Sequence, residues 1–335
     1  MRVAFDSRPL ADEHGLGRYA RCLLRTLREI AGARDEVVES HRPRGADVFH
    51  APWIGGAMLH SPCPMVVTIH DLTTVKRRGE QLRGGLRLRL RQLALQRAAR
   101  VIVPTEAIAE DAVRHFGLER GRIAIVGEAA DVSMYPRSPK EIAQTRARFG
   151  LPERYLLWVG CLEHPDPTRH IAELAATPRE LPLVLAGRTR PWAHELPNVI
   201  LTGHVSDEHL ASLYSGAHAL VEPSEHGPGL PAVEALACGT PVVAREVPAL
   251  REVLGERATF VAPGDLGGLV AAAQAARRPA PRPPAWSWQY AARATWAVYE
   301  RAAASADGER ASARTTRRRP LHRPGLHQPR RQGLQ

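Results

Sequence analysis

Several features are scarce in this sequence, and each absence excludes a class of protein. The four cysteines lie far apart and form no CxxC pair, so neither a disulfide framework nor a zinc site is indicated. No run approaches the roughly 18 consecutive apolar residues of a membrane span. The first ten residues, MRVAFDSRPL, also lack the apolar stretch of a signal peptide. We therefore expect a cytoplasmic protein.

Lysine is nearly absent, and this shapes how the positive charge is interpreted. Lys76 and Lys140 are the only lysines, which leaves 44 arginines among the 46 basic residues, and the formal net charge is +11. Residues 305–335 contribute +6 of that charge and residues 1–304 contribute +5. The segment 305–335 is rich in Pro, Gly, Arg and Gln without apolar periodicity, which predicts a disordered basic tail. It also lacks the aromatic residues that single-strand readers stack on bases, so nucleic acid is not an expected partner.

What the sequence does contain is enough apolar material for two domains. Of its 335 residues 44% are hydrophobic, and single cores stop growing at roughly 250–300 residues. Short apolar runs alternate with longer amphipathic stretches such as 15–31 and 106–116, the pattern of βαβ units around parallel sheets. The pattern predicts strands at 2–6, 46–51, 65–71, 99–105, 122–129, 154–160, 181–187, 198–203, 218–224, 240–245 and 258–264.

These elements form two consecutive series, which predicts an α/β protein with two doubly wound domains. We place the first domain at residues 1–140 and the second at 141–285. A closing helix is expected at 286–304, before the tail. In open sheets of this type ligands bind beyond the carboxyl ends of the strands. We therefore expect the active site in a cleft between the two domains.

The most informative stretch is SEHGPGLPAVEALACGTPVVA, residues 224–244. Gly227 and Gly229 permit close backbone approach, and Pro231 suits a first helical turn. A glycine-rich loop that leads into a helix N-terminus favours an anion such as phosphate. Glu234 is expected in the first turn of that helix, where it either contacts a ligand or only complements the helix dipole.

This stretch resembles the donor-binding segment of the retaining family 4 glycosyltransferases, which have the GT-B fold of two Rossmann-like domains. The resemblance implies that Glu234 binds the ribose hydroxyls of a nucleotide sugar, and that the loop residues around it contact the donor. These residues are Gly227, Gly229, Leu230 and Pro231. The family's other carboxylate, which touches the donor sugar, falls on His226, and its phenylalanine falls on Pro228. A shift of one residue would let Glu225 replace the missing carboxylate.

Other segments resemble the same family in the same order along the chain. HGLGRYA (14–20) is similar to its first glycine loop, which implies that Gly15 and Gly17 face the donor diphosphate. VVTIHDL (66–72) is similar to the strand that carries an active-site histidine, here His70. Val205 falls near the nucleotide base.

The family's diphosphate-binding Arg-Lys pair falls on Thr168 and Arg169. Arg169 can hold the diphosphate through its guanidinium, whereas Thr168 supplies only a hydroxyl. His70, Arg169, Glu225 and His226 are thus the candidate catalytic residues.

The resemblance implies transfer of a sugar from a nucleotide diphosphate donor, GDP-mannose or a UDP-sugar, to an acceptor hydroxyl with retention. It implies no cofactor and no metal, and the sequence contains no DxD-type carboxylate cluster. The departures at Thr168, His226 and Pro228 leave an alternative open. In that alternative the chain is a degenerate, non-catalytic GT-B protein that binds a nucleotide sugar or a partner enzyme.

A basic segment hints at the acceptor. In residues 76–100 arginines alternate with leucines, a pattern that suits contact with anionic lipid on the inner face of a membrane. A lipid-linked glycan, a glycolipid or a polysaccharide would then be the product. The alternative is a solvated helix pair whose leucines pack on the sheet.

Overall fold

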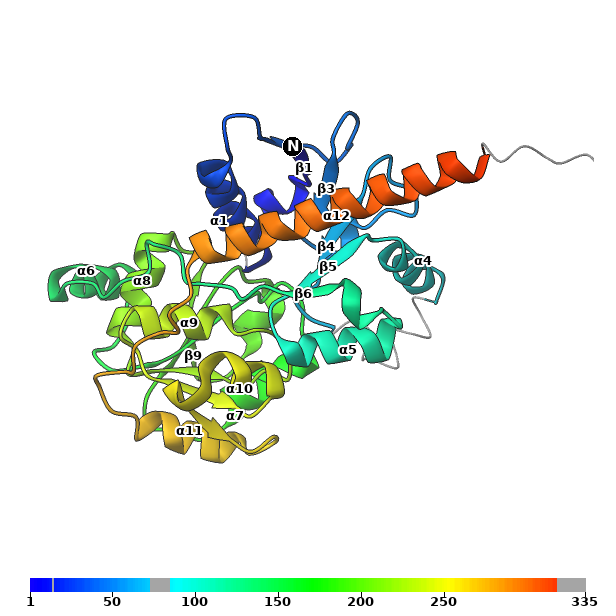
Figure 1. Cartoon of the computed structure of the whole chain (residues 1–335). Coiled ribbons are helices and arrows are strands. Elements are labelled where there is room, and N and C mark those ends of the chain that lie inside the picture. The colour runs from blue at the N-terminus through cyan, green and yellow to red at the C-terminus, as the bar shows by residue number, and fades with distance from the viewer. Residues whose placement is uncertain (14, 73–84, 318–335) are drawn as a thin grey trace, which may run out of the picture.

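Two parallel sheets of six strands each form the framework of the computed structural model, which describes residues 1–13, 15–72 and 85–317 (Figure 1). The first sheet has the order β2-β1-β3-β4-β5-β6. Its strands are β1 (Arg2–Phe5), β2 (Glu36–Glu39), β3 (Val48–Ala51), β4 (Met65–Thr68), β5 (Arg100–Val103) and β6 (Ile123–Ile125). Its helices are α1 (Gly15–Ile30), α4 (Gly85–Gln96) and α5 (Glu106–Phe116), with 3₁₀ turns η1 (Arg8–Ala11), η2 (Ile54–Gly56) and η3 (Arg120–Arg122).

The second sheet has the order β12-β11-β10-β7-β8-β9, which is the Rossmann order. Its strands are β7 (Leu156–Val159), β8 (Leu183–Ala186), β9 (Val199–Gly203), β10 (Ala219–Glu222), β11 (Val242–Arg245) and β12 (Ala258–Val261). Its helices are α6 (Pro139–Phe149), α7 (Ile171–Ala176), α8 (Asp207–Gly216), α9 (Leu230–Ala237), α10 (Pro248–Leu254) and α11 (Leu266–Gln274). The 3₁₀ turns are η4 (Pro167–Arg169), η5 (Pro191–Glu195) and η6 (Gly255–Arg257).

The inner strands of each sheet are buried on both faces, so they read as continuous apolar runs. In the first domain Val3 and Phe5 pack under α1, whereas Ala4 points to the opposite face, toward α5. In the second domain Leu157 packs with α8 and α9, and Leu156 packs with α7 and α11. This alternation gives each domain two apolar layers, one on either side of its sheet.

The predicted strands are all present, and the structure adds β2, which the sequence analysis missed. In the sequence EVVE only Val37 is buried, so this short edge strand has too few apolar positions to be recognised. Helix α6 packs against α8 of the second domain, so the boundary expected at residue 140 falls inside the first turn of α6.

The closing helix exists and is longer than expected. Helix α12 (Trp288–Arg317) follows the second domain and lies against α1 of the first domain (Figure 1). It therefore includes residues 305–317, which were expected to be disordered; residues 318–335 lie outside the described residues. Tyr299 of α12 is buried, and its hydroxyl lies 2.6 Å from Nδ1 of His50 on β3. No helix in the described parts of the chain is long and apolar enough to cross a membrane.

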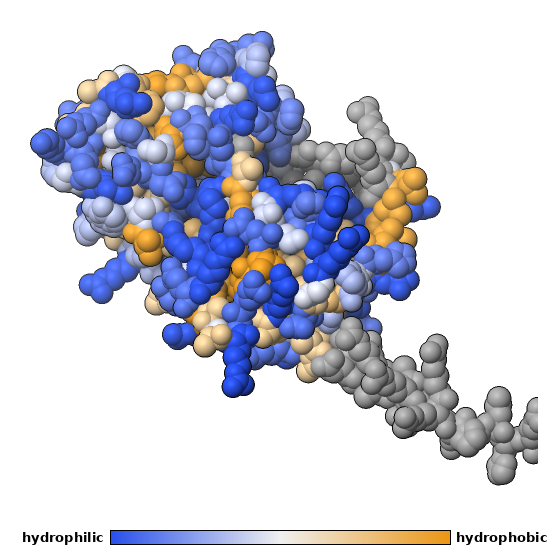
Figure 2. Space-filling model, turned by 90° about the horizontal axis from the view of Figure 1, so that it is seen from above, coloured by the Kyte–Doolittle hydropathy of each residue, from blue (hydrophilic) through white to orange (hydrophobic). Residues whose placement is uncertain are grey.

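One face of the molecule is mostly polar (Figure 2). Figure 2 shows the face seen from above as largely hydrophilic, with apolar residues in small separate patches. Scattered apolar residues of this kind are normal on protein surfaces.

Candidate active site

A cleft of about 430 Å³ lies between the two domains, at the carboxyl ends of strands from both sheets. The first domain lines it with residues that include Gly15, Arg18, His70 and Glu128. The second domain lines it around the point where β7 and β10 run side by side and the strand order reverses. Ligands bind at such switch points in open α/β sheets. The candidate donor-binding residues on this side are Thr168, Val205, Gly227, Gly229, Leu230, Pro231 and Glu234.

The glycine loop before α9 has a backbone conformation that favours glycine. Gly227 and Gly229 have φ angles of 109° and 79°, a region that favours glycine. A Cβ atom at Gly229 would also lie 2.3 Å from Cδ2 of Leu250. Helix α9 begins directly afterwards at Leu230, and no side chain caps its first amides. The loop therefore presents a helix N-terminus to the cleft, as an anion site requires.

Glu234 lies deeper in the helix than expected. It is the fifth residue of α9, so it stands in the second turn and not in the first, where it would complement the dipole. The side chain is buried, and its Oε2 accepts a hydrogen bond of 3.0 Å from the Tyr214 hydroxyl. Burial raises the pKa of Glu234 to about 7, although Arg18 and Tyr214 act in the opposite direction. Burial makes ionisation of this carboxylate unfavourable, and a carboxylate with so perturbed a pKa in a cleft indicates a contact with a ligand.

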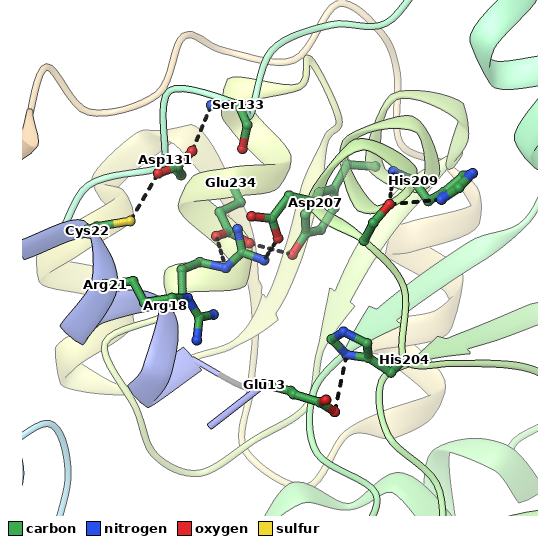
Figure 3. Close-up of polar contacts among 12 residues, drawn as sticks. Glu13, Arg18, Arg21, Cys22, Asp131, Ser133, His204, Asp207, His209 and Glu234 are labelled. Carbon is green, nitrogen blue, oxygen red and sulfur yellow. Dashed lines mark hydrogen bonds and ion pairs between the residues drawn. The ribbon is translucent and has the colours of Figure 1, made fainter. Parts of the chain in front are cut away.

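Arg18 is a cleft residue that the sequence analysis did not identify. It belongs to α1 of the first domain, yet its Nε lies 3.1 Å from Oε1 of Glu234 in the second domain. Its Nη2 donates to Oδ1 of Asp207 at 2.6 Å. Figure 3 shows the guanidinium between these two carboxylates. Sequence reasoning had no signal for this pairing, because it depends on how the two domains face each other.

Near Arg18, the two predicted glycines play different parts. Gly15 lines the cleft and is exposed, as expected for a residue that faces the donor. Gly17 is buried and does not line the cleft. A Cβ atom there would come within 1.8 Å of the Asp12 carbonyl oxygen, so glycine lets the loop before α1 pack against the helix. The expectation that Gly17 faces the diphosphate is therefore not met.

His70 lies in the cleft with both ring nitrogens engaged. Nδ1 is 2.7 Å from Oε1 of Glu128, and Nε2 is 3.0 Å from the Pro52 carbonyl oxygen. Burial alone would lower the pKa of His70, but the Glu128 carboxylate outweighs it and the pKa is raised. Glu128 follows β6, is buried and lines the cleft, and the sequence analysis did not single it out. With both nitrogens engaged inside the first domain, the pair places a charged imidazole ring at the wall of the cleft.

Thr168 and Arg169 form the turn η4 at the floor of the cleft. The Thr168 hydroxyl donates to Oδ1 of Asp166 at 2.7 Å, and its amide donates to the same oxygen. Arg169 donates to the Cys161 carbonyl and remains about one-third exposed, with its Nε 3.5 Å from Asp166. Both residues line the cleft, and Arg169 is the one of the two that can contribute a positive charge there.

The missing family carboxylate is not supplied by Glu225. Glu225 lies 3.0 Å from His170 and 3.1 Å from Arg245, and it does not line the cleft. Burial opposes ionisation, yet His170 and Arg245 hold the pKa of Glu225 below its usual range. This ion pair draws the carboxylate away from the cleft, so the expected one-residue shift does not occur. His226 does line the cleft.

Another carboxylate stands in the cleft instead. Glu222 ends β10, is 8% exposed and accepts hydrogen bonds from the amide and hydroxyl of Ser224. Burial raises the pKa of Glu222, against the hydrogen bonds from Ser224 and the charge of Arg169. Its place at the carboxyl end of a predicted strand was the available signal, and sequence reasoning passed over it. Within the described residues no group of three or more His, Cys, Asp or Glu is arranged to hold a metal ion.

Two Rossmann-like domains that face each other across one cleft define a protein of the GT-B class. Residues 3–133 match the family described as Glycosyltransferase Family 4, and residues 153–277 match Glycosyl transferases group 1. The chain belongs to the glycosyltransferases of GT-B type, which confirms the resemblance and the predicted fold class.

Curated relatives are glycosyltransferases of several kinds. The O-antigen chain mannosyltransferase B of Escherichia coli is 28% identical over 53% of this chain and 51% of its own length. The 2-deoxystreptamine glucosyltransferase of Streptomyces kanamyceticus is 27% identical over 72% of this chain and 70% of its own. The D-inositol 3-phosphate glycosyltransferase of Mycolicibacterium smegmatis is 30% identical over 69% and 57%. The chain thus spans about half to 70% of the length of these relatives.

Solved structures share the fold over nearly the whole chain. A sucrose-phosphate synthase from Thermosynechococcus elongatus superposes with a TM-score of 0.66 and 22% identity, over 94% of this chain and 100% of the other. Anabaena HepE in complex with UDP-glucose gives a TM-score of 0.64 at 16% identity with the same coverage. At these identities the likeness establishes the fold alone.

Proposed function

We propose that this protein transfers a sugar from a nucleotide diphosphate donor to an acceptor hydroxyl with retention of configuration. GDP-mannose or a UDP-sugar is the donor, in keeping with the mannosyl- and glucosyltransferases among its relatives. The observation that carries the proposal is the buried Glu234 carboxylate beside the glycine loop and the open N-terminus of α9. A nucleotide sugar contains a ribose diol and a diphosphate. A carboxylate can accept hydrogen bonds from the diol, and an open helix N-terminus can bind the diphosphate.

The proposed mechanism uses positioning and electrostatics. Glu234 takes the ribose hydroxyls, while the α9 amides and Arg169 hold the diphosphate and stabilise the charge that develops as its bond to the sugar breaks. Glu222 and His226 bind the donor sugar, and His70 with Glu128 faces the reaction from the first domain. The departing phosphate accepts the proton of the acceptor hydroxyl. No protein nucleophile and no metal is required in this scheme.

The acceptor side is proposed from the surface of the first domain. Leu86, Leu90 and Leu93 of α4 are 73%, 40% and 49% exposed, and exposed arginines lie beside them. This surface supports contact with anionic lipid on the cytoplasmic face of a membrane, and thus a lipid-linked acceptor. Residues 76–84 of the predicted basic segment lie outside the described residues.

The test begins with binding. UDP and GDP are titrated in a thermal-shift assay, and the sugar donors of the better binder are then followed for hydrolysis and transfer. We expect Glu234→Ala to lose nucleotide binding, whereas Glu208→Ala, an exposed carboxylate on α8, keeps it. An unchanged Glu234→Ala variant would refute the site. Binding without hydrolysis or transfer over a panel of acceptors would instead support the non-catalytic alternative that Thr168 and His226 raised.

A further inference from the structure

Arg18 connects the two walls of the cleft at the carboxylate that the proposed function assigns to ribose. The residue stands in the first turn of α1, and its side chain is only 12% exposed although it reaches into the other domain. Two of its three nitrogens meet carboxylates of the second domain, Glu234 at 3.1 Å and Asp207 at 2.6 Å (Figure 3). The third nitrogen, Nη1, is buried with no hydrogen-bond partner among the described residues. A buried donor without a hydrogen-bond partner is energetically unfavourable, especially on a charged group. Its presence at Arg18 therefore indicates a functional role for this side chain.

A second contact of the same kind stands next to the first. Glu13, in the loop before α1, lies 3.8 Å from His204 and 3.7 Å from Arg188 of the second domain. Figure 3 shows Glu13 and Arg18 projecting from the same end of α1 toward the second domain. The start of α1 thus presents one anion and one cation to opposite charges. This complementarity favours one arrangement of the two domains.

Glu234 depends on Arg18 for its counter-charge. The groups that act on it are Arg18 from α1, Asp207 and Tyr214 from α8, and Asp131 from the segment after β6. Arg18 is the single cation of this set; the two aspartates oppose ionisation, and Tyr214 provides a hydrogen bond. A carboxylate has about four acceptor positions, and Oε1 of Glu234 is buried with no hydrogen-bond partner among the described residues. Arg18 therefore stabilises the anion without using all of its acceptor positions.

We propose that Arg18 is a positioning residue for the nucleotide: from the first domain it holds Glu234 as an oriented carboxylate, so that tight nucleotide binding requires the closed cleft. This inference rests on the proposed function, because it assumes that Glu234 binds a nucleotide. It assigns a donor-binding role to α1 beyond its glycine loop. It also links closure to the donor, since the counter-charge reaches Glu234 only when the domains meet.

The experiment measures UDP and GDP binding to four proteins by calorimetry: the unmodified chain, Arg18→Gln, Glu234→Gln and the double variant. We expect Arg18→Gln to weaken the preferred nucleotide on the order of tenfold or more near neutral pH. The loss should shrink as the pH rises toward about 9, because a higher pH ionises Glu234 without its counter-charge. In the Glu234→Gln background, Arg18→Gln should add nothing. Arg18→Lys should restore part of the affinity.

A matched control separates this effect from damage to α1. Arg28→Gln makes the same chemical change on the same helix, where Arg28 pairs with Glu39 at 3.0 Å on the side of β2. It should leave nucleotide affinity unchanged, and circular dichroism should show that every variant is folded. Equal affinity of Arg18→Gln and the unmodified chain would overturn the inference. Tighter nucleotide binding by Arg18→Gln would also overturn it, because Arg18 would then block the site. An equal loss of affinity in the Glu234→Gln background would overturn it as well. If the unmodified chain binds neither nucleotide, the proposed function itself fails.

Discussion

At the scale of single residues, two glutamates of the same segment differ in burial and in pKa. Glu234 is buried and its pKa is raised to about 7, whereas Glu225 is ion-paired and its pKa is lowered. Both residues lie within one loop and helix, yet only Glu234 faces the cleft. Burial without full compensation is typical of groups kept for function. Glu234 is therefore one of the cleft groups that should titrate near neutral pH.

This predicts how stability depends on pH. The pKa of Glu234 is about 7 in the folded chain and 4.5 in the unfolded chain. Between these two pH values the folded state binds more protons than the unfolded state. The free energy of unfolding therefore falls as the pH rises from 4.5 through about 7. The unmodified chain should lose about 3 kcal/mol of unfolding free energy relative to Glu234→Gln over that range. Urea unfolding of both proteins at several pH values provides the measurement. Parallel curves would show that Glu234 is not buried as described.

At the scale of elements, α12 ties the second domain back to the first. Its Trp288 ring meets Tyr19 of α1 edge-on, and Tyr299 closes a buried chain of contacts through His50 to the Thr68 hydroxyl. Burial lowers the pKa of His50 to about 3, so this ring stays neutral and depends on both hydroxyl partners. The helix therefore stabilises the first domain by polar contacts as well as by apolar packing.

Removal of one hydroxyl tests this role of α12. Tyr299→Phe leaves Nδ1 of His50 without its 2.6 Å partner and should cost about 1–3 kcal/mol of stability. Tyr290→Phe, on the same helix but 64% exposed, should change stability by less than about 0.5 kcal/mol. The thermal midpoints of the two variants give the comparison. Equal midpoints would mean that the hydroxyl contact contributes nothing.

At the scale of the whole molecule, charged groups gather in the cleft and beside an exposed apolar patch of the first domain. The cleft between the domains is held by opposite charges, Arg18 with Asp207 and Glu234, and Glu13 with Arg188. On the outside, α4 exposes leucines and arginines together. The formal charge of +11 thus includes positive groups at an apolar surface as well as those of the C-terminal segment.

This arrangement predicts binding to anionic vesicles. The chain should co-sediment with liposomes that contain phosphatidylserine, and less so as salt rises, because the contact is partly electrostatic. Serine at Leu86, Leu90 and Leu93 together should abolish most of the binding. Serine at Leu59, Val113 and Ile125, which are 36–40% exposed elsewhere on the first domain, is the matched control. Binding that ignores lipid charge, or that survives the α4 changes, would argue against a membrane-bound acceptor.

The sequence by itself determined the order of strands and helices, the glycine loop and the helix that carries Glu234, because these depend mainly on neighbours along the chain. Apolar runs predicted every strand except β2, and Gly227 and Gly229 marked the loop that leads into α9. Only the tertiary structure decided which side chains meet. It paired Arg18 with Glu234, turned Glu225 toward Arg245 and placed Glu222 in the cleft. The physical reason is that an ion pair depends on distance in space and on burial, and both arise only when domains distant in sequence pack together.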